Sequence, residues 1–393
     1  MWIRGKAFYN DEIEEICIEF DRIIRNIKKE CKPDISLPQS TILLPGAIDM
    51  HVHVRGAQLS YKETVATATS EAAYGGITVV VDMPNTIPPI ITYERVIERL
   101  REFENYSRTD FGIYAGVGKE TEKIDKLPIA GYKIYPEDLE KDELYSVLKS
   151  KKLKVIHSEI MKANKVFRKF RSIWMELAPL RILFSDNKFT KIHITHITNY
   201  YTLKLAKNLG LTTDVTPHHI LINGEKDCLT KVNPPIRDNI TRFELLKALF
   251  EADAVASDHA PHAKWEKVQD FELCPPGIAA ISFTVPFLFS LVKKGILDIK
   301  NTIKLISLNP AKILDIKYGK IEKNYFANFT VIKFERWRYS TRYSKVTQTP
   351  FDGYPLDALV YMTIVQGKVV YEDGEVYPIR GINPFDPGSW KGV

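Results

Sequence analysis

The chain has 393 residues, of which 45% are hydrophobic and 26% charged, and this ordinary globular composition excludes wholesale disorder and collagen-like repeats. Its length exceeds one average domain and fits a large domain plus a small one. The net charge of +6 comes from 55 basic and 49 acidic residues scattered along the chain, which argues against a nucleic-acid partner.

The N-terminal region alternates polar and apolar residues over Glu12 to Phe20, as a half-buried strand does. From about residue 50 to 315, short β-branched runs alternate with helical patterns, which is typical of βα units and a parallel sheet. A strand leading into His51 is followed by seven more expected strands, at Ile77–Val81, Phe111–Ala115, Gly131–Ile134, Lys154–His157, Lys191–Ile194, Thr212–Val215 and Ala254–Ser257. Helices are expected between them, at Lys62–Tyr74, Tyr93–Phe103, Asp138–Ser150, Asn199–Asn208 and Arg242–Glu251. Eight parallel strands close a (β/α)8 barrel of the TIM type.

Near the C-terminal end, Ala327 to Lys333 and Ala358 to Tyr371 have the character of strands, and Gly367 is placed for a turn between two of them. We therefore predict an α/β protein of two domains. Residues 46–318 form the barrel, and residues 1–45 plus 319–393 form a small β-sandwich domain from both ends of the chain.

The cysteines and the distribution of apolar residues indicate where in the cell the protein is expected. Cys17, Cys31, Cys228 and Cys274 lie far apart without a CxxC pair, so we expect reduced thiols rather than a disulfide framework. The N-terminus lacks the apolar core of a signal peptide, and no run of about 18 apolar residues is present to span a membrane. These observations predict a cytoplasmic protein with no membrane partner.

All nine histidines fall between residues 51 and 262, and the first two form the run His51-Val52-His53. Residues two apart in a strand point to the same face, so both imidazoles face one way and Arg55 continues that face. Paired neutral imidazoles are ligands for zinc or a similar divalent ion. The alternative is a pair of solvated surface histidines.

Three further metal-competent side chains, His157, His196 and Asp258, stand at the ends of expected strands. Barrel enzymes carry their active residues at the C-terminal ends of strands, so one common site is expected. Lys133 lies in an otherwise apolar strand, where an unpaired buried ammonium is costly. Either its amine reaches the surface, or a lowered pKa lets it react with carbon dioxide to give a carbamate that bridges two metal ions.

These residues resemble the amidohydrolase superfamily and, within it, the dihydroorotases whose barrel is joined to a small β domain. Further motifs support the resemblance over nearly the whole chain: Lys62-Glu63-Thr64, Asp82-Met83-Pro84-Asn85-Thr86, Thr216-Pro217-His218-His219, Lys231-Val232-Asn233-Pro234-Pro235, Ser257-Asp258-His259-Ala260-Pro261-His262 and Pro275-Pro276-Gly277-Ile278. One departure is Gly56-Ala57-Gln58, where such dihydroorotases usually have Glu-Pro-Gly.

The resemblance implies two divalent metal ions, zinc in the first place, held by His51, His53, Lys133 as the N6-carboxylated bridge, His157, His196 and Asp258. It implies that His53 adjoins the substrate and that Arg55, Asn85 and His262 hold its carboxylate. Asn233 and the backbone at Pro276 and Gly277 would contact the ring amides. His193 is expected to have a structural partner instead of a metal, while His218, His219 and His259 flank the site without an assigned role.

The implied reaction is the reversible cyclisation of N-carbamoyl-L-aspartate to (S)-dihydroorotate in de novo pyrimidine (UMP) biosynthesis. A metal-bound hydroxide would attack the ring amide, and Asp258 would pass its proton to the leaving nitrogen. An allantoinase or hydantoinase is the alternative enzyme, and a non-catalytic dihydroorotase-like scaffold is the alternative from another class. The partner is a small-molecule substrate, and a homo-oligomer or an association with aspartate carbamoyltransferase stays open.

Overall fold

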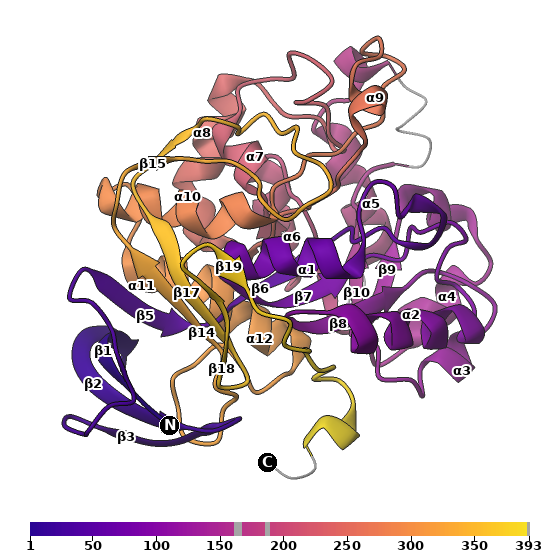
Figure 1. Cartoon of the computed structure of the whole chain (residues 1–393). Coiled ribbons are helices and arrows are strands. Elements are labelled where there is room, and N and C mark those ends of the chain that lie inside the picture. The colour runs from indigo at the N-terminus through magenta and orange to yellow at the C-terminus, as the bar shows by residue number, and fades with distance from the viewer. Residues whose placement is uncertain (161–166, 185–188, 391–393) are drawn as a thin grey trace.

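The computed structural model describes residues 1–160, 167–184 and 189–390 (Figure 1). Its centre is a ring of eight parallel strands that pair in chain order: β6 (Ala47–Val52), β7 (Ile77–Asp82), β8 (Asp110–Ala115), β9 (Gly131–Ile134), β10 (Leu153–Ile156), β11 (Ile192–Ile194), β12 (Thr212–Val215) and β13 (Ala254–Val255). A parallel bridge between Val52 and His259 joins the first strand to the segment that follows the last. The predicted TIM-type barrel is therefore confirmed.

Helices lie around the barrel and cover its strands, which is why all six residues of β7 are buried. The described helices are α1 (Val65–Tyr74), α2 (Tyr93–Tyr106), α3 (Thr121–Ile124), α4 (Leu144–Lys149), α5 (Trp174–Phe184), α6 (Tyr200–Asn208), α7 (Pro217–Leu221), α8 (Asn239–Lys247), α9 (Lys264–Lys267), α10 (Ile281–Lys293), α11 (Ile299–Ile303) and α12 (Asn309–Leu314).

The expected helices are present with shifted bounds, and two of them differ most from the structure. The segment expected as one helix from Asp138 is a 3-10 turn, Pro136–Glu140, followed by α4, because the Asp138 carboxylate accepts from the backbone N–H of Tyr135 at 2.8 Å and caps a separate turn. Helix α8 begins earlier than expected, since the Asp238 carboxylate accepts from the N–H groups of Ile240 and Thr241.

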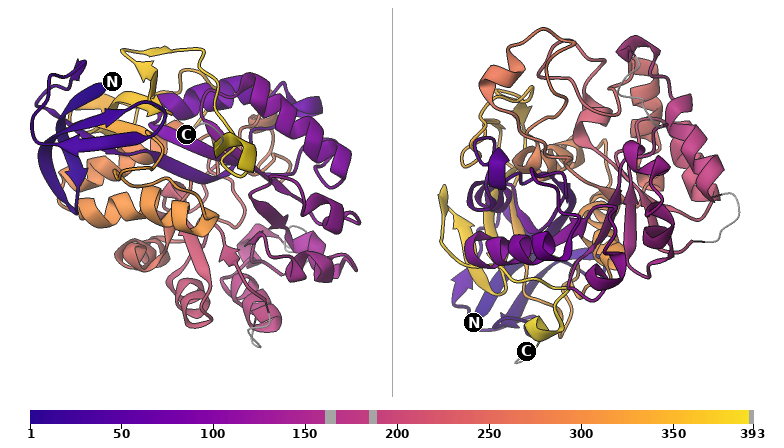
Figure 2. Two further views of the ribbon diagram at one scale, coloured as in Figure 1. Left: turned by 90° about the horizontal axis from the view of Figure 1, so that it is seen from below. Right: turned by 90° about the vertical axis from the view of Figure 1, so that its right-hand side faces the viewer.

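Both ends of the chain contribute to one nine-stranded sheet beside the barrel. Its strands are β1 (Trp2–Tyr9), β2 (Glu12–Phe20), β3 (Ile24–Lys28), β4 (Ile35–Ser36), β5 (Thr41–Pro45), β14 (Phe329–Lys333), β17 (Leu359–Val365), β18 (Lys368–Glu372) and β19 (Glu375–Val376), and a separate pair is formed by β15 (Trp337–Arg338) and β16 (Pro355–Leu356). Strand β5 pairs with β1 on one side and with β14 on the other, which joins the two chain ends. The views of Figures 1 and 2 agree in placing the indigo and yellow strands side by side. The predicted domain boundaries, 46–318 and 1–45 plus 319–393, stay a prediction.

The β-rich domain contacts the barrel at the amino ends of its first strands. Thr330 Oγ1 accepts from the backbone N–H of Ala47, where β6 begins, at 3.1 Å. Asp110, the first residue of β8, accepts from Asn328 Nδ2 at 2.8 Å and from Gln366 Nε2 at 2.5 Å. These contacts leave the opposite, carboxyl end of the barrel for the site.

The prediction of reduced thiols is wrong. Cys17 is bonded to Cys31 and Cys228 to Cys274, each pair with Cα atoms 6.0 Å apart. The sequence gives no signal for this pairing, because the partners are 14 and 46 residues apart and only the fold brings them within disulfide reach. Within the described ranges, none of the helices combines the length and the apolar character that crossing a bilayer requires.

Candidate active site

Six side chains predicted to bind metal line one cavity of about 220 Å³ at the carboxyl end of the barrel: His51, His53, Lys133, His157, His196 and Asp258. They stand on or shortly after five barrel strands, namely β6, β9, β10, β11 and β13. The carboxyl ends of parallel strands meet at one face of a barrel, which is why residues so far apart in the chain share one cavity.

Three of these side chains are close enough to hold one cation. The Nε2 atoms of His51 and His53 lie 3.3 Å apart, and Asp258 Oδ1 is 3.2 Å from the first and 3.1 Å from the second. All three residues are buried. Burial also lowers the pKa of His51 well below its usual value, which keeps the imidazole in the neutral form that binds metal.

The other two histidines complete this side of the cavity. The ring of His196 lies 5.1 Å from that of His51 and 4.4 Å from that of His157, measured between centroids. The pKa of His196 is likewise lowered well below its usual value, chiefly by burial. These four histidines and Asp258 line the cavity together with two basic side chains, those of Lys133 and Arg171.

Hydrogen bonds at the Nδ1 atoms of His51, in β6, and His53, directly after it, decide which nitrogen of each ring faces the cavity. His51 Nδ1 donates to Thr195 Oγ1 at 2.5 Å, and that hydroxyl donates to Asp214 Oδ2 at 2.8 Å. His53 Nδ1 donates to Asn85 Oδ1 at 2.6 Å. Both Nε2 lone pairs are thereby left for a metal ion, as is typical of metal-binding histidines.

Lys133 is fully buried, and its Nζ has no hydrogen-bond partner in the described part of the chain. The alternative in which the amine reaches the surface is therefore wrong. Burial lowers the pKa of Lys133 to about 7, although Asp258 and Asp214 oppose this shift. A substantial fraction of the amine is thus neutral near pH 7, the form that reacts with carbon dioxide.

Three site residues adopt backbone conformations that side-chain-bearing residues rarely take. The φ angles of Arg55, His196 and Asp258 are +63°, +44° and +46°. Such left-handed residues cost of order 1–3 kcal/mol each and persist where the surrounding structure fixes them, often in active sites. Each of them follows the end of a barrel strand, and two of them, His196 and Asp258, line the cavity.

Two of the predicted substrate residues, Arg55 and His262, are absent from the lining of the cavity and lie buried behind it. They contact each other, with Arg55 Nη2 3.3 Å from His262 Nε2. His262 Nε2 is also 3.0 Å from the carbonyl oxygen of Pro276, a lining residue, and Lys62 Nζ lies 3.1 Å from its Nδ1. Burial and the cations of Arg55 and Lys62 lower the pKa of His262, so its imidazole is neutral.

The other predicted substrate contacts line the cavity: Asn85, Asn233, Pro276 and Gly277. Their contact with a substrate stays a prediction. Gly277 has φ +148°, and a Cβ there would lie 2.4 Å from the carbonyl oxygen of Ala260, so no other residue fits. Its N–H donates to Lys231 O at 2.8 Å. Because proline has no N–H, the groups of this segment that can meet a ring amide are carbonyl oxygens.

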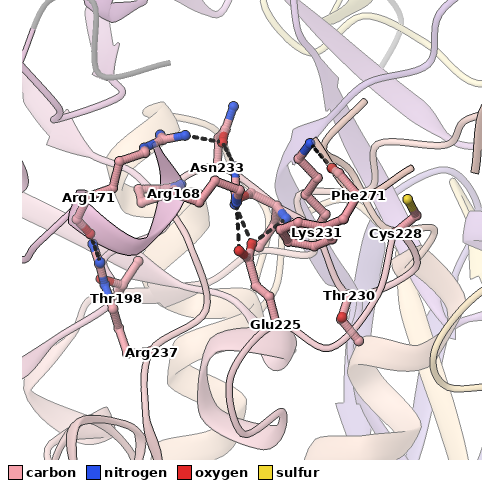
Figure 3. A network of polar contacts seen from close by, with 12 residues as sticks. Arg168, Arg171, Thr198, Glu225, Cys228, Thr230, Lys231, Asn233, Arg237 and Phe271 are labelled. Carbon is pink, nitrogen blue, oxygen red and sulfur yellow. Dashed lines mark hydrogen bonds and ion pairs between the residues drawn. The ribbon is translucent and has the colours of Figure 1, made fainter. Parts of the chain in front are cut away.

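Sequence reasoning missed Glu159, Arg168 and Arg171, which belong to the segment between β10 and α5. Glu159 and Arg171 line the cavity, and Arg168 lies close to Arg171 and Asn233 (Figure 3). His157 Nε2 donates to Glu159 Oε2 at 2.7 Å, and Arg171 Nε donates to Glu159 Oε1 at 3.2 Å. Arg171 Nη1 and Arg168 Nη1 both donate to Asn233 Oδ1, at 2.7 and 2.9 Å. The sequence signal is weak, namely an acidic residue two positions after His157 and arginines in the following loop.

The histidines without an assigned role have mostly structural surroundings. His193 Nε2 donates to Asp214 Oδ2 at 2.8 Å, as expected of a strand histidine with a partner. His219 Nε2 donates to the carbonyl oxygen of Pro234, and His259 Nδ1 accepts from the N–H of Ala280. His218 is buried without a hydrogen-bond partner among the described residues.

The chain resembles known proteins both in family and in sequence. Residues 42–370 match the model of the amidohydrolase family. A dihydroorotase of Sulfurisphaera tokodaii is 64% identical over 390 residues, which is 99% of this chain and 99% of that protein. A dihydroorotase of Saccharolobus solfataricus is 58% identical over 386 residues, 98% of each.

Solved structures resemble the fold. The L-hydantoinase of Arthrobacter aurescens superposes with a TM-score of 0.87 at 20% identity, covering 96% of this chain and 97% of that one. A D-hydantoinase from Thermus sp. gives a TM-score of 0.84 at 22% identity, covering 98% and 99%. At this identity the likeness concerns the architecture, a barrel joined to a β-rich domain.

Proposed function

The chain belongs to the amidohydrolase family and groups with its dihydroorotases, and from this we propose that it interconverts N-carbamoyl-L-aspartate and (S)-dihydroorotate. The observation that carries the proposal is the cavity in which two histidines, a buried lysine and an aspartate from distant strands meet. We further propose that the physiological direction is ring closure, as a step of de novo pyrimidine biosynthesis.

We propose two divalent metal ions, zinc in the first place, as the cofactor. The donor set fits them, since neutral imidazoles, a carboxylate and a buried amine without a partner in the described chain surround the cavity. His51, His53, His157, His196 and Asp258 would hold the ions, and Lys133 would bridge them as an N6-carboxylate. When bound, such ions supply Lewis acidity, which lowers the pKa of water and polarises an amide carbonyl.

Asp258 is the proposed proton carrier. Its Oδ1 lies within 3.2 Å of both histidines of β6, at the centre of the ligand group, so a proton taken from the attacking water has a short path to the ring nitrogen. Hydrolysis breaks the bond between the ring carbonyl and that nitrogen, which leaves with the proton. In the direction of ring closure the same carboxylate takes the proton from the attacking ureido nitrogen.

We propose that the substrate's free carboxylate is held by Arg55, Asn85 and His262. Since His53 occupies Asn85 Oδ1, the amide NH2 of Asn85 is the group left to donate to a carboxylate. Arg55 supplies the positive charge. His262 supplies a neutral N–H, which becomes available to the carboxylate when the imidazole rotates away from the carbonyl oxygen of Pro276. The carbonyl oxygens at Pro276 and Gly277 would accept from ring N–H groups.

A hydantoinase or allantoinase is the competing proposal, because hydantoinases share the architecture. The rings of those substrates carry no carboxylate at the corresponding position. The buried guanidinium of Arg55 and the neutral donors of Asn85 and His262 would then have no partner on the substrate. The sequence identity to dihydroorotases also favours the first proposal. A non-catalytic scaffold is disfavoured, since all six expected ligands are present in one cavity.

The test is to assay the zinc-supplemented protein with dihydroorotate, allantoin and hydantoin side by side, together with cyclisation of N-carbamoyl-L-aspartate. We expect turnover of dihydroorotate and N-carbamoyl-L-aspartate with negligible rates for the other two. Faster hydrolysis of hydantoin or allantoin would overturn the proposed substrate. No bound metal and no turnover of any of them would support the scaffold.

Location and assembly are also proposals: a cytoplasmic enzyme that forms a homo-oligomer or associates with aspartate carbamoyltransferase. The cytoplasmic location was expected partly because the four cysteines were expected to be reduced. The two disulfides remove that argument. Analytical ultracentrifugation of the protein, alone and mixed with aspartate carbamoyltransferase, tests the two assemblies. A monomer in both samples would exclude them.

A further inference from the structure

We infer that Arg171 is a positioning residue that couples the metal ligand His157 to the substrate contact Asn233. Its guanidinium lies between them, bonded to Glu159 on one side and to the Asn233 carboxamide on the other. It also lines the cavity. The inference rests on the proposed function for the role of Asn233 and on the structure alone for the role of Glu159.

The first arm runs through Glu159 to His157. Glu159 is 1% exposed and accepts from His157 Nε2 at 2.7 Å, which leaves Nδ1 as the nitrogen of that ring available to a metal ion. A buried carboxylate needs a second charge partner, and Arg171 supplies it with two of its nitrogens, Nε and Nη2. Arg171 therefore fixes the carboxylate that sets the tautomer and the orientation of His157.

The second arm runs to the carboxamide of Asn233. Arg171 and Arg168 both point an N–H at the same atom of this side chain, as Figure 3 shows. Guanidinium groups only donate hydrogen bonds, so the Asn233 atom that both arginines contact has to be the amide oxygen, Oδ1. The two arginines therefore determine which way the Asn233 amide is oriented. The NH2 group then points away from the arginines, and it is the group that Asn233 can offer to a ligand.

This geometry specifies what Asn233 recognises. An NH2 group donates, so its partner on the substrate is a carbonyl oxygen and not a ring N–H. Dihydroorotate has two ring carbonyls, and the one that is attacked has to lie at the metal ligands. We assign the Asn233 NH2 to the other, the ureido carbonyl, while ring N–H groups remain for the backbone carbonyls at Pro276 and Gly277.

Neighbouring ion pairs hold both arginines in place. Arg168 is bonded to both carboxylate oxygens of Glu225 and to the carbonyl oxygen of Val232, next to Asn233. The backbone carbonyl of Arg171 accepts from Arg237, which is itself paired with Glu176 on α5. Arg171 is thus anchored at its backbone and at its head group, as a positioning residue requires.

The experiment compares Arg171→Met with Arg168→Met in the full chain, using zinc affinity by chelator competition as well as kcat and KM. In the described structure Arg168 bonds to Asn233 and Glu225 and not to Glu159, so it is the matched control that affects only the Asn233 arm. We expect Arg171→Met to weaken zinc binding and to raise KM, each about tenfold to a hundredfold. Arg168→Met should raise KM and leave zinc affinity unchanged. Arg101→Met, at an exposed position on α2, should change neither.

A double-mutant cycle tests whether Arg171 acts through Asn233. We expect the KM effects of Arg171→Met and Asn233→Ala to be clearly less than multiplicative when combined, because the two residues share one interaction. Fully multiplicative effects, or zinc affinity in Arg171→Met within twofold of the parent, would overturn the inference. Inactivity of the parent protein on dihydroorotate would instead contradict the proposed function, and the zinc series would still decide the Glu159 arm.

Asn233→Asp keeps the test valid if Arg171→Met does not fold. Aspartate retains an oxygen toward both arginines, and adds charge complementarity, but replaces the NH2 donor with an acceptor. We expect its KM to rise at least as much as that of Asn233→Ala while its melting temperature is unchanged or higher. A KM equal to that of the parent protein would show that the NH2 group is not what binds substrate.

Discussion

In one half of the cavity, His51, Lys133 and Asp258 belong to barrel strands or directly follow them, whereas in the opposite half Arg171 and Asn233 lie on loops. The strand-borne half is fixed by the main-chain hydrogen bonds of the barrel. The loop-borne half is fixed by side-chain ion pairs, such as those of Arg168 with Glu225 and of Arg171 with Glu159. The groups proposed to take part in the reaction thus lie on rigid elements, whereas these groups proposed to position the substrate lie on loops.

The largest expected effect comes from the strand-borne half, by changing Asp258 to asparagine. The substitution keeps the size of the side chain, and asparagine tolerates the left-handed φ of +46° at this position, so the fold should be retained. Without the proton carrier, kcat should fall by about 10² to 10⁴. The measurement is steady-state turnover of dihydroorotate with zinc in excess.

The control for this change is the melting temperature of the same sample. An unchanged melting temperature with the expected loss of kcat assigns the effect to chemistry. Near-normal turnover in the zinc-replete variant would remove Asp258 from the mechanism and with it the claim that the strand-borne half carries the reaction.

A smaller effect is expected for Arg55→Lys, which tests the proposal that Arg55 binds the substrate's carboxylate from behind the strand-borne half. Lysine keeps the charge but loses the forked geometry that binds a carboxylate through two parallel hydrogen bonds. A lost charge-assisted hydrogen bond is worth about 1.5–3 kcal/mol, so KM should rise roughly tenfold to a hundredfold with a smaller change in kcat. Initial-rate kinetics with N-carbamoyl-L-aspartate measures both constants.

The exposed Arg101→Lys provides the matched control for Arg55→Lys. If kcat falls as steeply as KM rises, Arg55 acts on the reacting groups and the two halves of the site are less separate than proposed. An unchanged KM would show that the carboxylate is held elsewhere.

The gathering of the strand-borne residues in one cavity could be predicted from the sequence, for a physical reason. Strand periodicity places His51 and His53 on one face, and the rule that barrel sites lie at strand ends brings in His157, His196 and Asp258. Each of these inferences depends on residues close together in the chain or on a general property of the fold. The cavity accordingly contains all six predicted ligands.

The loop-borne half could not be predicted in the same way. Arg171 meets Asn233 62 residues further along the chain, and no periodicity links two loops. The cysteine pairs are missed for the same reason, since Cys228 and Cys274 are 46 residues apart. Loop conformation depends on specific side-chain contacts, which become visible only in the folded structure.

A pH effect of about tenfold per unit is expected for carboxylation of Lys133 in the metal-free protein. Carbon dioxide reacts with the neutral amine, and the pKa of Lys133 is lowered to about 7 by burial. Above pH 7 the amine is mostly neutral, whereas each unit below 7 reduces the neutral fraction about tenfold. Incorporation of isotopically labelled carbon dioxide, followed by carbon NMR, should therefore fall steeply from pH 7 to pH 5.

Lys154 is the matched control, because it is also fully buried and lies on the neighbouring strand β10. Its pKa is lowered to about 8 by burial, yet its Nζ already donates to the carbonyl oxygen of Ser150 at 2.7 Å. Lys133→Met should abolish the labelled carbamate and Lys154→Met should leave it. If labelled carbon dioxide is still incorporated in Lys133→Met, the carbamate forms on another amine, outside the strand-borne half.

The smallest expected effect on activity concerns the disulfide between Cys228 and Cys274, which ties the loop leading to Asn233 to the segment that precedes Pro276. Replacing both cysteines with serine should lower the melting temperature by roughly 5 °C, because closing a loop of this length is worth about 3–4 kcal/mol. It should also raise KM, since two substrate-contacting loops lose their link. The matched pair Cys17 and Cys31, in the β-rich domain, should affect stability and leave KM unchanged. If both double variants leave KM unchanged, the disulfide does not help to position the substrate-contacting loops. The ion pairs of Arg168 and Arg171 would then be sufficient to hold the loop-borne half of the cavity.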